Sequence, residues 1–431
     1  MKWGVKQEDK TIQDKIIDSV YAQQNNLIVG RAGAGKSTLY ESMADTLTDS
    51  CVRVGSTGVS AINVGGQTAH RLFRIPVGIP TQKDFENKAI IRNLRKIFNK
   101  DSPVGFVFID ETSMINAASL TWIDFVLKQC YNNDLPFGGL GMNLFGDLFQ
   151  LGCVVRPEER PLYLEHFNAI NFFEADAFNK ANFNLFNMTE VHRQSDQELK
   201  KHLNNIRVYG QLFSLKESLE YFNDNCFNKT QQNDCEDYLV TTNKNAEYRN
   251  KIAFDKIKSK AFHFKAKFSG FDSEPAPKDL YLKQGCRVMI LENNLEQGYS
   301  NGTKGTVKSL NKFDVTVMLD SGKEVCIGPK TWVQYSYKLD KENQLVKFES
   351  GSYTQIPLKM SNGLTIHKSQ GCDLDRANID LGDYCFAPHL AYVALSRVRT
   401  IEGIRLLRPL KQADIKIDYS VNRFCKSNNL L

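Results

Sequence analysis

Long hydrophobic runs are missing from this sequence. No stretch reaches about 18 uninterrupted apolar residues, the length that a membrane-spanning helix needs. The opening segment, MKWGVKQEDKTIQDK, lacks the apolar centre of a secretory signal. We therefore expect a soluble, intracellular protein without a membrane partner. It would be cytoplasmic if bacterial or viral, and nuclear or mitochondrial if eukaryotic.

Metal-binding cysteine patterns and a strong excess of one charge are also missing. The ten cysteines include no Cys-x-x-Cys pair and no matching histidine spacing for zinc, so reduced structural thiols are expected. Lys and Arg number 55 against 49 Asp and Glu, a net charge of +6 that is compatible with a nucleic-acid partner but does not establish one. At 431 residues the chain exceeds what one hydrophobic core usually serves, so two or more domains are expected.

The amino-terminal half alternates short apolar strands with helical patterns. Apolar positions at helical spacing predict a helix over 11–24, and NNLIVG, which follows it, reads as a buried strand that ends at Gly30. Further strands are predicted at 51–57, 104–110 and 142–147, with a helix over 115–130. This alternation predicts an α/β fold with a parallel sheet and helices on both faces.

The carboxyl-terminal half shows a second series of this kind. It begins near residue 235 and resumes at 376–382 and in the helix-like FAPHLAYVALSRV. Between these, residues 303–357 show short strands separated by Gly, Asp and Ser turns, without a helical period. We interpret this segment as a small β-barrel inserted into a second α/β domain.

GRAGAGKST, residues 30–38, is the strongest local motif. It satisfies G-x-x-x-x-G-K-S between a predicted strand and a predicted helix, which is the context of a phosphate-binding loop. The backbone N–H groups of such a loop surround phosphate oxygens, its lysine reaches the β- and γ-phosphates, and the next hydroxyl ligates Mg²⁺. A glycine-rich turn without a ligand is the alternative. The expected residues for ATP and Mg²⁺ are Gly30, Gly33, Ala34, Gly35, Lys36, Ser37 and Thr38.

Polar residues at the ends of neighbouring strands complete a candidate ATPase site. Asp110 would hold Mg²⁺ and Glu111 would polarise the attacking water, while Gln150 would hydrogen-bond the γ-phosphate or that water. Arg193 and Arg397 are candidates to neutralise charge on the transferred phosphoryl group, Arg397 as an arginine finger from the second domain. Taken alone, the acidic pair is more often a helix N-terminal feature and each arginine a surface ion pair.

Two segments suit a polyanionic partner. Residues 88–100, KAIIRNLRKIFNK, place basic side chains at helical spacing opposite apolar ones. Residues 256–268, KIKSKAFHFKAKF, interleave five lysines with three phenylalanines, a combination of charge and stacking rings that is used on single strands. Each segment alone is more often a solvated face.

In their order along the chain, the motifs resemble the petite-integration-frequency (PIF) family of DNA helicases, in the 5′-to-3′ branch of helicase superfamily one. RecD-type helicases are more distant relatives. The resemblance covers nearly the whole chain. It is carried by STGVSAINVGGQTAHRLF, FIDETSMI, LPFGGLGMNLFGDLFQL, VHRQSDQELKKHLNNIRVYG, LVTTNKNAEYRN, LTIHKSQGCDLDRANIDLG and FAPHLAYVALSRVRTIEGIRLL.

The resemblance implies an architecture of two RecA-like P-loop NTPase domains with ATP between them. The first would span residues 1–195 and carry a small wedge-bearing insertion at about 74–100. The second would combine 196–302 with 358–431, and the segment 303–357, recognised by its turns, would be its β-barrel-like insertion.

The resemblance also implies the activity and the contacts. The expected protein is a monomeric, ATP-dependent DNA helicase that moves 5′ to 3′ along single-stranded DNA and unwinds forked or 5′-tailed duplexes. Gln13 would read the adenine of ATP. The residues expected to contact DNA are Thr57, Ser60, His70, His367, Lys368 and Ser369.

HKSQG, residues 367–371, is interpreted as a loop that couples DNA to the nucleotide, with Gln370 and Gly371 toward the cleft between the lobes. A nucleophile with its base is the weaker interpretation, because adjacent residues rarely converge on one substrate atom. Two alternatives to a helicase stay open. One is a DNA clamp or remodeller that uses ATP without unwinding, and the other is a P-loop kinase, which predicts neither the second-domain arginine nor this polar motif.

Overall fold

The three-dimensional structure is a computed structural model of the chain. It describes residues 11–31, 33–76, 78–153, 155, 159–189, 196–208, 212–228, 237–271, 274–294, 296–299, 301–339, 341, 345–370 and 374–431. Two residues of the predicted site, Arg193 and Gly371, lie outside these ranges. Within them, no helix combines the length and the apolar character that crossing a membrane requires.

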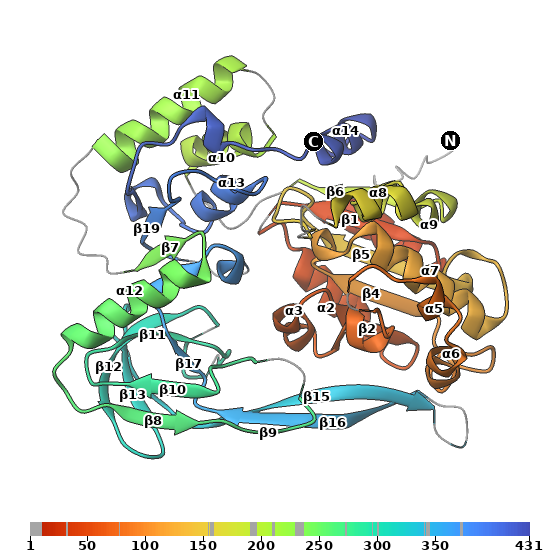
Figure 1. Ribbon diagram of the computed structural model, residues 1–431, viewed down its shortest axis with the longest axis horizontal. Helices are drawn as coiled ribbons and strands as arrows, with labels where there is room; N and C mark the ends of the chain where they lie inside the picture. Colours follow the sequence, from red (N-terminus) through yellow and green to blue (C-terminus); the bar gives the residue numbers. More distant parts are fainter. Residues whose placement is uncertain are drawn as a thin grey trace, which may run out of the picture.

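Six parallel strands form the first sheet, in the order β3-β2-β4-β5-β1-β6 (Figure 1). Both of its faces are buried: Leu27 and Val29 of β1 point into one core, and Ile28 points into another. Burial on both sides explains why the inner strands β1, β4 and β5 are mostly apolar instead of alternating with polar residues. The strands are β1 Asn26–Gly30, β2 Cys51–Gly55, β3 Gln67–Thr68, β4 Phe106–Asp110, β5 Gly141–Gly146 and β6 Asn184–Met188.

Helices cover both faces of the first sheet. On the face of Ile28 lie α1 (Ile12–Tyr21) and α2 (Lys36–Thr46), and α7 (Ala117–Tyr131) lies on the opposite face. The other helices of this part are α3 Gly58–Asn63, α4 Ala69–Leu72, α5 Gln82–Phe85, α6 Lys88–Leu94, α8 Arg160–Phe167 and α9 Asp176–Lys180, with the 3₁₀ turns η1 Thr112–Met114, η2 Pro136–Gly139 and η3 Phe172–Glu174.

The helical pattern over 88–100 forms a helix only as far as Leu94. Beyond it, the N–H groups of Ile97 and Phe98 both donate to the carbonyl of Leu94, which tightens the chain into a turn. This turn brings Phe98 into the core, where its ring stacks on Phe73 at 5.8 Å between centroids. Burial of this large ring outweighs continuation of the helix.

A second parallel sheet has the order β18-β7-β19-β20. Its helix α12 packs on β7 and β18, while the apolar side chains of α10 and α13 join the core that also contains Leu239 of β7. The strands are β7 Tyr238–Val240, β18 Gly363–Thr365, β19 Ala377–Asp380 and β20 Ile404–Leu406. The helices are α10 Gln197–Val208, α11 Leu212–Asn223, α12 Asn243–Lys256, α13 Leu390–Leu395 and α14 Tyr419–Ser427, with the short π turn η4 Asp224–Asn228 and the 3₁₀ turns η5 His367–Ser369, η6 Ile401–Gly403 and η7 Gln412–Asp414.

Antiparallel strands fill the segment between β7 and β18. They form three sheets, with the orders β14-β13-β12-β11-β17, β10-β8 and β15-β16-β9. The strands are β8 Phe262–Lys265, β9 Lys267–Ser269, β10 Asp279–Leu282, β11 Arg287–Ile290, β12 Lys304–Leu310, β13 Val315–Leu319, β14 Glu324–Ile327, β15 Lys330–Leu339, β16 Leu345–Gln355 and β17 Leu358–Met360. The α/β class is thus confirmed, with two parallel sheets and an all-β segment within the second half. The antiparallel strands of that segment begin before residue 303, the start that the sequence predicts.

The β15–β16 hairpin leaves the other antiparallel strands and runs beneath the first sheet (Figure 1). Its arms are 10 and 11 residues long. The side chain of Arg71 donates to Ser350 Oγ at 3.2 Å, and Ile62 packs against the cluster that contains Trp332 and Tyr353. The hairpin therefore connects the antiparallel part with the first sheet, and it does not close a barrel with β11–β14.

A buried charge cluster fixes the antiparallel part to the second sheet. Asp237, just before β7, is 2% exposed and lies between two cations. Its Oδ2 accepts from Arg287 Nη2 of β11 at 3.2 Å and from Lys304 Nζ of β12 at 2.8 Å. A buried carboxylate with two basic partners is well compensated, so this junction is specific.

Candidate nucleotide site and DNA-facing loops

The phosphate-binding loop connects β1 to α2, as the sequence indicates. Gly33 and Gly35 have φ values of 82° and 80°, the left-handed conformation that side chains with a Cβ rarely adopt. Lys36 begins α2, and its Nζ donates to the carbonyls of Gly30 at 2.8 Å and Arg31 at 3.0 Å. The ammonium group is therefore held over the loop. Ala34 is buried, whereas the hydroxyl-bearing Ser37 and Thr38 are exposed.

The acidic pair lies at the end of β4. Asp110 is the last residue of the strand, and Glu111 has the left-handed φ of 54° that starts η1. Ser56 Oγ donates to the carbonyl of Glu111 at 2.7 Å and holds this backbone in place. Burial raises the pKa of both carboxyl groups, and together with the charge of Asp110 it raises the pKa of Glu111 to about 7. A carboxylate with a pKa near neutrality suits a general base.

Strand order brings three loops together at one edge of the first sheet. Because β5 lies between β4 and β1, the residues after β5 stand between the acidic pair and the phosphate loop. Asp147 follows β5 and is 0% exposed, and Gln150 follows in the same turn at 6% exposed. The Oε1 of Gln150 accepts from Gln370 Nε2 at 3.4 Å. This contact joins two motifs that are more than 200 residues apart, one from each parallel sheet.

Arg207 is a site residue that the motifs did not indicate. It lies in the last turn of α10, is 4% exposed, and its Nη2 donates to Asp147 Oδ1 at 3.0 Å. Burial alone would raise the pKa of Asp147, but the charges of Arg207 and Lys36 outweigh it and keep that pKa below its usual value. The position of Arg207 could have indicated burial. Arg207 follows Leu199 by eight positions and therefore lies on the apolar face of its helix.

Arg397 reaches this site from the second sheet. Its side chain is 1% exposed, with Nε donating to the Val393 carbonyl at 3.1 Å and Nη2 to Ser396 Oγ at 3.0 Å. Its charge counteracts the burial of Glu111 and lowers the pKa of that carboxyl group. The structure therefore brings Arg397 into electrostatic range of Glu111.

The HKSQG motif forms η5 directly after β18. Lys368 is exposed, and the half-buried ring of His367 lies parallel to Phe386 with 6.4 Å between centroids. Ser369 differs from the expectation of a DNA-contacting hydroxyl: it is 0% exposed and its Oγ donates to the carbonyl of Ile366 at 2.8 Å. Because this hydroxyl bonds the backbone of its own turn, Ser369 stabilises the loop, while Lys368 and His367 face outward.

The first segment predicted to contact DNA contains the cap of a short helix. Thr57 is the N-cap of α3 and exchanges hydrogen bonds with Ser60, which is 4% exposed. The cap sits directly on β2, since a Cβ at Gly55 would lie 2.1 Å from the backbone nitrogen of Ala61. The hydroxyl of Ser60 thus serves the cap, whereas His70 on α4 is exposed.

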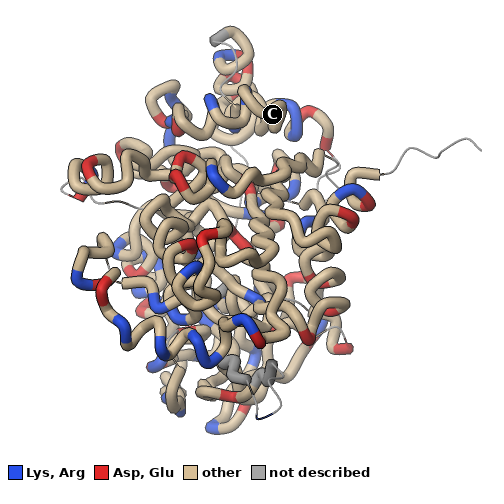
Figure 2. Tube along the Cα trace, turned by 90° about the vertical axis from the view of Figure 1, so that its right-hand side faces the viewer, with Lys and Arg blue, Asp and Glu red and all other residues tan. Residues whose placement is uncertain are grey.

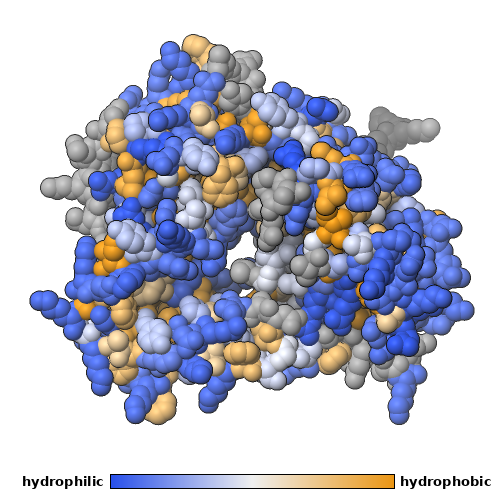
Figure 3. Space-filling view, viewed as in Figure 1, coloured by the Kyte–Doolittle hydropathy of each residue, from blue (hydrophilic) through white to orange (hydrophobic). Residues whose placement is uncertain are grey.

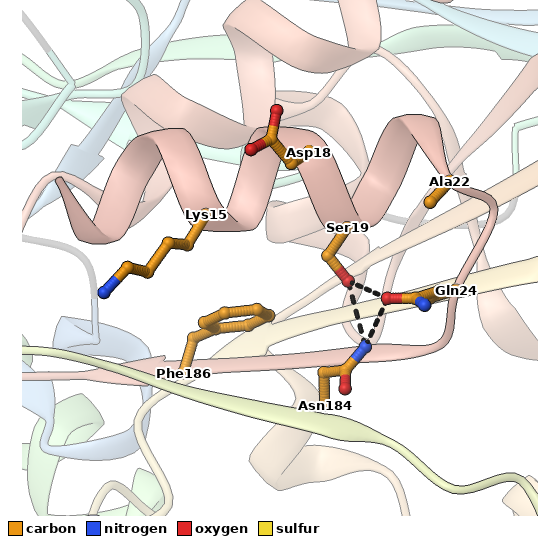
Figure 4. Close-up of a pocket in the computed structure, with 7 residues that line it drawn as sticks. All are labelled: Lys15, Asp18, Ser19, Ala22, Gln24, Asn184 and Phe186. Atoms are coloured by element: carbon orange, nitrogen blue, oxygen red, sulfur yellow. Dashed lines mark hydrogen bonds between the residues drawn. The ribbon is translucent and has the colours of Figure 1, made fainter. Parts of the chain in front are cut away.

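The amino-terminal helix carries Gln13, whose side chain is exposed on its first turn. A pocket beside α1 is lined by Lys15, Asp18, Ser19, Ala22, Gln24, Asn184 and Phe186 (Figure 4). It lies at the opposite edge of the sheet from the phosphate loop, because Asn184 begins β6 and Gln24 precedes β1. Its polar groups bond one another: Asn184 Nδ2 donates to Ser19 Oγ at 3.0 Å. The pocket is separate from the nucleotide site.

The two predicted basic segments are on the surface. Lysine and arginine gather in the lower part of the face that contains α6 (Figure 2). The exposed basic residues of that segment include Lys88, Arg92, Arg95 and Lys96. In 256–268 all five lysines are exposed, but of the three phenylalanines only Phe268, at 53%, offers an open ring, since Phe264 is buried.

Comparison with known proteins agrees with this geometry. The family model described as PIF1-like helicase matches residues 4–213. A curated relative, the ATP-dependent DNA helicase Pif1 of Bdellovibrio bacteriovorus, is 27% identical over 92% of this chain and 87% of its own length.

Solved structures extend the likeness to nearly the whole chain. Pif1 from Bacteroides sp in complex with ADP-AlF4 is 32% identical, with a TM-score of 0.86 over 97% of each chain. The Bacteroides Pif1 bound to single-stranded DNA is also 32% identical and covers 98% of each chain, but its TM-score is 0.67. The chain belongs to the PIF1-like helicase family.

Proposed function

We propose that this ATP-dependent DNA helicase moves 5′ to 3′ along single-stranded DNA by closing two RecA-like lobes on ATP and opening them after hydrolysis. The first lobe is residues 1–195, with a wedge-bearing insertion at about 74–100. The second is built on the parallel strands β7, β18, β19 and β20, and the antiparallel segment inserted in it runs from β8 to β17, so it includes more than the expected 303–357. The observation that carries the proposal is the convergence of Gln370 and Arg397, from the second sheet, on Gln150 and Glu111 of the first.

Each residue of the nucleotide site has a distinct role. Lys36, held over the loop, binds the β- and γ-phosphates in place of the Gly30 and Arg31 carbonyls. Glu111 takes the proton of the attacking water. Gln150 orients that water, and Arg193 and Arg397 stabilise the charge of the transferred phosphoryl group. Loss of the γ-phosphate removes the contacts that favour the closed arrangement, which converts hydrolysis into movement.

The donor set at the loop suits Mg²⁺. This ion takes oxygen ligands from one or two carboxylates and from substrate phosphates. Ser37 offers an exposed hydroxyl, and Asp110 offers a carboxylate whose raised pKa, caused by burial, a nearby cation would lower. Bound Mg²⁺ would neutralise the charge that develops on the β- and γ-oxygens. Gln13 would face the adenine.

Single-stranded DNA would cross both lobes. The side chains available to it are Thr57 and His70 beside the first sheet, and His367 and Lys368 beside the second. Figure 3 shows an opening in the surface between the two parts of the molecule. We expect a monomer to act on forked or 5′-tailed duplexes.

Two assays test the proposal. ATP hydrolysis is measured with and without single-stranded DNA, and Lys36→Ala, which lacks the phosphate ligand, serves as the inactive control. Strong stimulation by DNA is expected, and its absence would refute coupling between the two sites. Unwinding is then compared on duplexes with a 5′ or a 3′ single-stranded tail. Preference for the 3′ tail would overturn the polarity, and ATPase without unwinding of either duplex would favour a clamp or remodeller.

The proposed division of labour has its own test. His367→Ala should reduce DNA-stimulated hydrolysis more than basal hydrolysis, because the ring faces the DNA side of the loop and not the phosphates. His166→Ala, an exposed histidine on α8, is the matched control. Equal losses of basal and stimulated rates in His367→Ala would place the ring in the nucleotide site.

A further inference from the structure

Asp147 and Arg207 form an interior ion pair to which the roles above assign no function. Asp147 is 0% exposed and Arg207 is 4% exposed. One hydrogen bond joins them, from Nη2 of the arginine to Oδ1 of the carboxylate at 3.0 Å. Removal of two charges from water is costly, and apolar side chains of similar size often stabilise a core as well. Stability alone is therefore a weak reason for this pair.

The pair uses only part of its bonding capacity. Asp147 Oδ2 and Arg207 Nε are both buried, and neither has a hydrogen-bond partner in the described part of the chain. One is an acceptor and the other a donor. A guanidinium and a carboxylate can form two parallel hydrogen bonds, so a modest reorientation of Arg207 would satisfy both atoms at once. The pair thus has a second, bidentate arrangement available to it.

Arg207 holds the turn that carries Gln150. The Asp147 carbonyl accepts from the N–H of Gln150 at 3.0 Å, and Asp147 Oδ1 accepts from the N–H of Phe149 at 3.0 Å. The Arg207 guanidinium also lies over the Phe149 ring, 4.1 Å from its centroid, while His389 meets that ring edge-on at 5.5 Å. The turn is therefore fixed from α10 through two of its four residues.

This arrangement links the turn to the second sheet. Helix α10 packs on α11 and α13, so Arg207 moves with those helices. On its other side, Gln150 meets Gln370 of the HKSQG loop. The same pair also affects Lys36 of the phosphate loop electrostatically. Burial lowers the pKa of Lys36; the charge of Asp147 opposes this shift, and the charge of Arg207 adds to it.

We propose that Arg207 is a positioning residue for ATP hydrolysis, which acts through Asp147 and Phe149 to aim Gln150 at the reacting phosphate as the two sheets close on ATP. In the closed state the single hydrogen bond becomes bidentate, and the turn is locked. The inference rests on the role proposed above for Gln150.

The test measures kcat and KM for ATP at saturating single-stranded DNA. Arg207→Gln should lower kcat about tenfold and change KM by less than about twofold. The turn would no longer place Gln150 correctly, while the phosphate loop keeps its backbone conformation. Arg207→Lys should stay near the glutamine variant, since lysine keeps the charge but lacks the planar fork. Arg408→Gln is the matched control: Arg408 forms a bidentate pair with the buried Asp414, so its loss should lower the melting temperature and leave kcat unchanged.

A double-variant cycle tests whether Arg207 acts through Gln150. Gln150→Ala combined with Arg207→Gln should be no slower than Gln150→Ala alone, within about twofold, because both changes remove the same function. Multiplicative losses in the double variant would overturn the positioning role while leaving Gln150 in place. If Gln150→Ala alone hydrolyses ATP at the normal rate, the proposed role of Gln150 fails and the inference fails with it. Wild-type kcat in Arg207→Gln, with only a lower melting temperature, would reduce the pair to a structural element.

Discussion

The protonation state of Glu111 should affect both the rate of ATP hydrolysis and the stability of the fold. Burial and the charge of Asp110 raise its pKa to about 7. A carboxyl group with this pKa is ionised in about one molecule in eleven at pH 6 and in about ten of eleven at pH 8. If Glu111 is the base, kcat/KM for ATP, which reports the ligand-free protein, should rise about tenfold over that interval.

The stability of the fold responds to pH in the opposite direction: it falls as pH rises, whereas the rate of hydrolysis rises. The folded pKa of about 7 exceeds the ordinary value of 4.5, so the folded state binds the proton more tightly than the unfolded state. Any stabilisation from this group is present below pH 4.5 and is lost as pH rises through about 7, at a cost of about 3 kcal/mol. Glu111→Gln carries no such charge. It should therefore be almost inactive, and at about pH 8 it should melt several degrees above wild type.

Two measurements decide this prediction. The first is kcat/KM for ATP across pH, at saturating single-stranded DNA, with ATP binding followed at each point. The second is the melting temperature of wild type and Glu111→Gln at about pH 5 and pH 8, with Glu86→Gln on the exposed end of α5 as the matched carboxylate control. A flat rate between pH 6 and pH 8, or a glutamine variant no more stable than wild type at high pH, would refute the reasoning.

Three further predictions follow from contacts described above. Gly55→Ala should destabilise the first sheet by about 2 kcal/mol, seen as a lower melting temperature, because its Cβ would overlap the backbone of α3. Asp237→Asn removes the carboxylate that faces the buried Lys304, while Arg287 keeps Asp320, and should cost about 3 kcal/mol. Limited proteolysis should therefore cut near the antiparallel junction, while Glu292→Gln is unaffected. Lys368→Ala should weaken single-stranded DNA binding and lower the salt dependence of log Kd by about one unit, since this exposed ammonium would contact a phosphate.

Features that depend on local chain chemistry could be predicted from the sequence. The phosphate loop needs left-handed backbone at Gly33 and Gly35, and this requirement is visible in the residues themselves. Strands β1, β2, β4 and β5 were equally visible, because burial on both faces makes them mostly apolar. The short β3 and the polar, half-buried β6 were not predicted.

Features that depend on distant partners could not be predicted. The charge of Arg207 is neutralised by Asp147, 60 residues earlier, and such a pair cannot be predicted from a local sequence pattern. Ser369 appears available in the sequence, yet its hydroxyl is used by its own turn. Strand pairing cannot be recognised from local sequence either. The β15–β16 arms were assigned to a barrel, whereas they pair with each other and β16 pairs with β9.

The central position of β7 in the second sheet has a consequence for biosynthesis. This strand pairs only with β18 and β19, so residues 241–362 must be made and folded back before the sheet can form. The strands of the first sheet, by contrast, are all translated once Met188 has emerged. Closing so long a loop is slow and entropically costly. During synthesis the phosphate-binding half should therefore fold first, and a ribosome-bound chain should acquire nucleotide binding before it acquires DNA-stimulated hydrolysis.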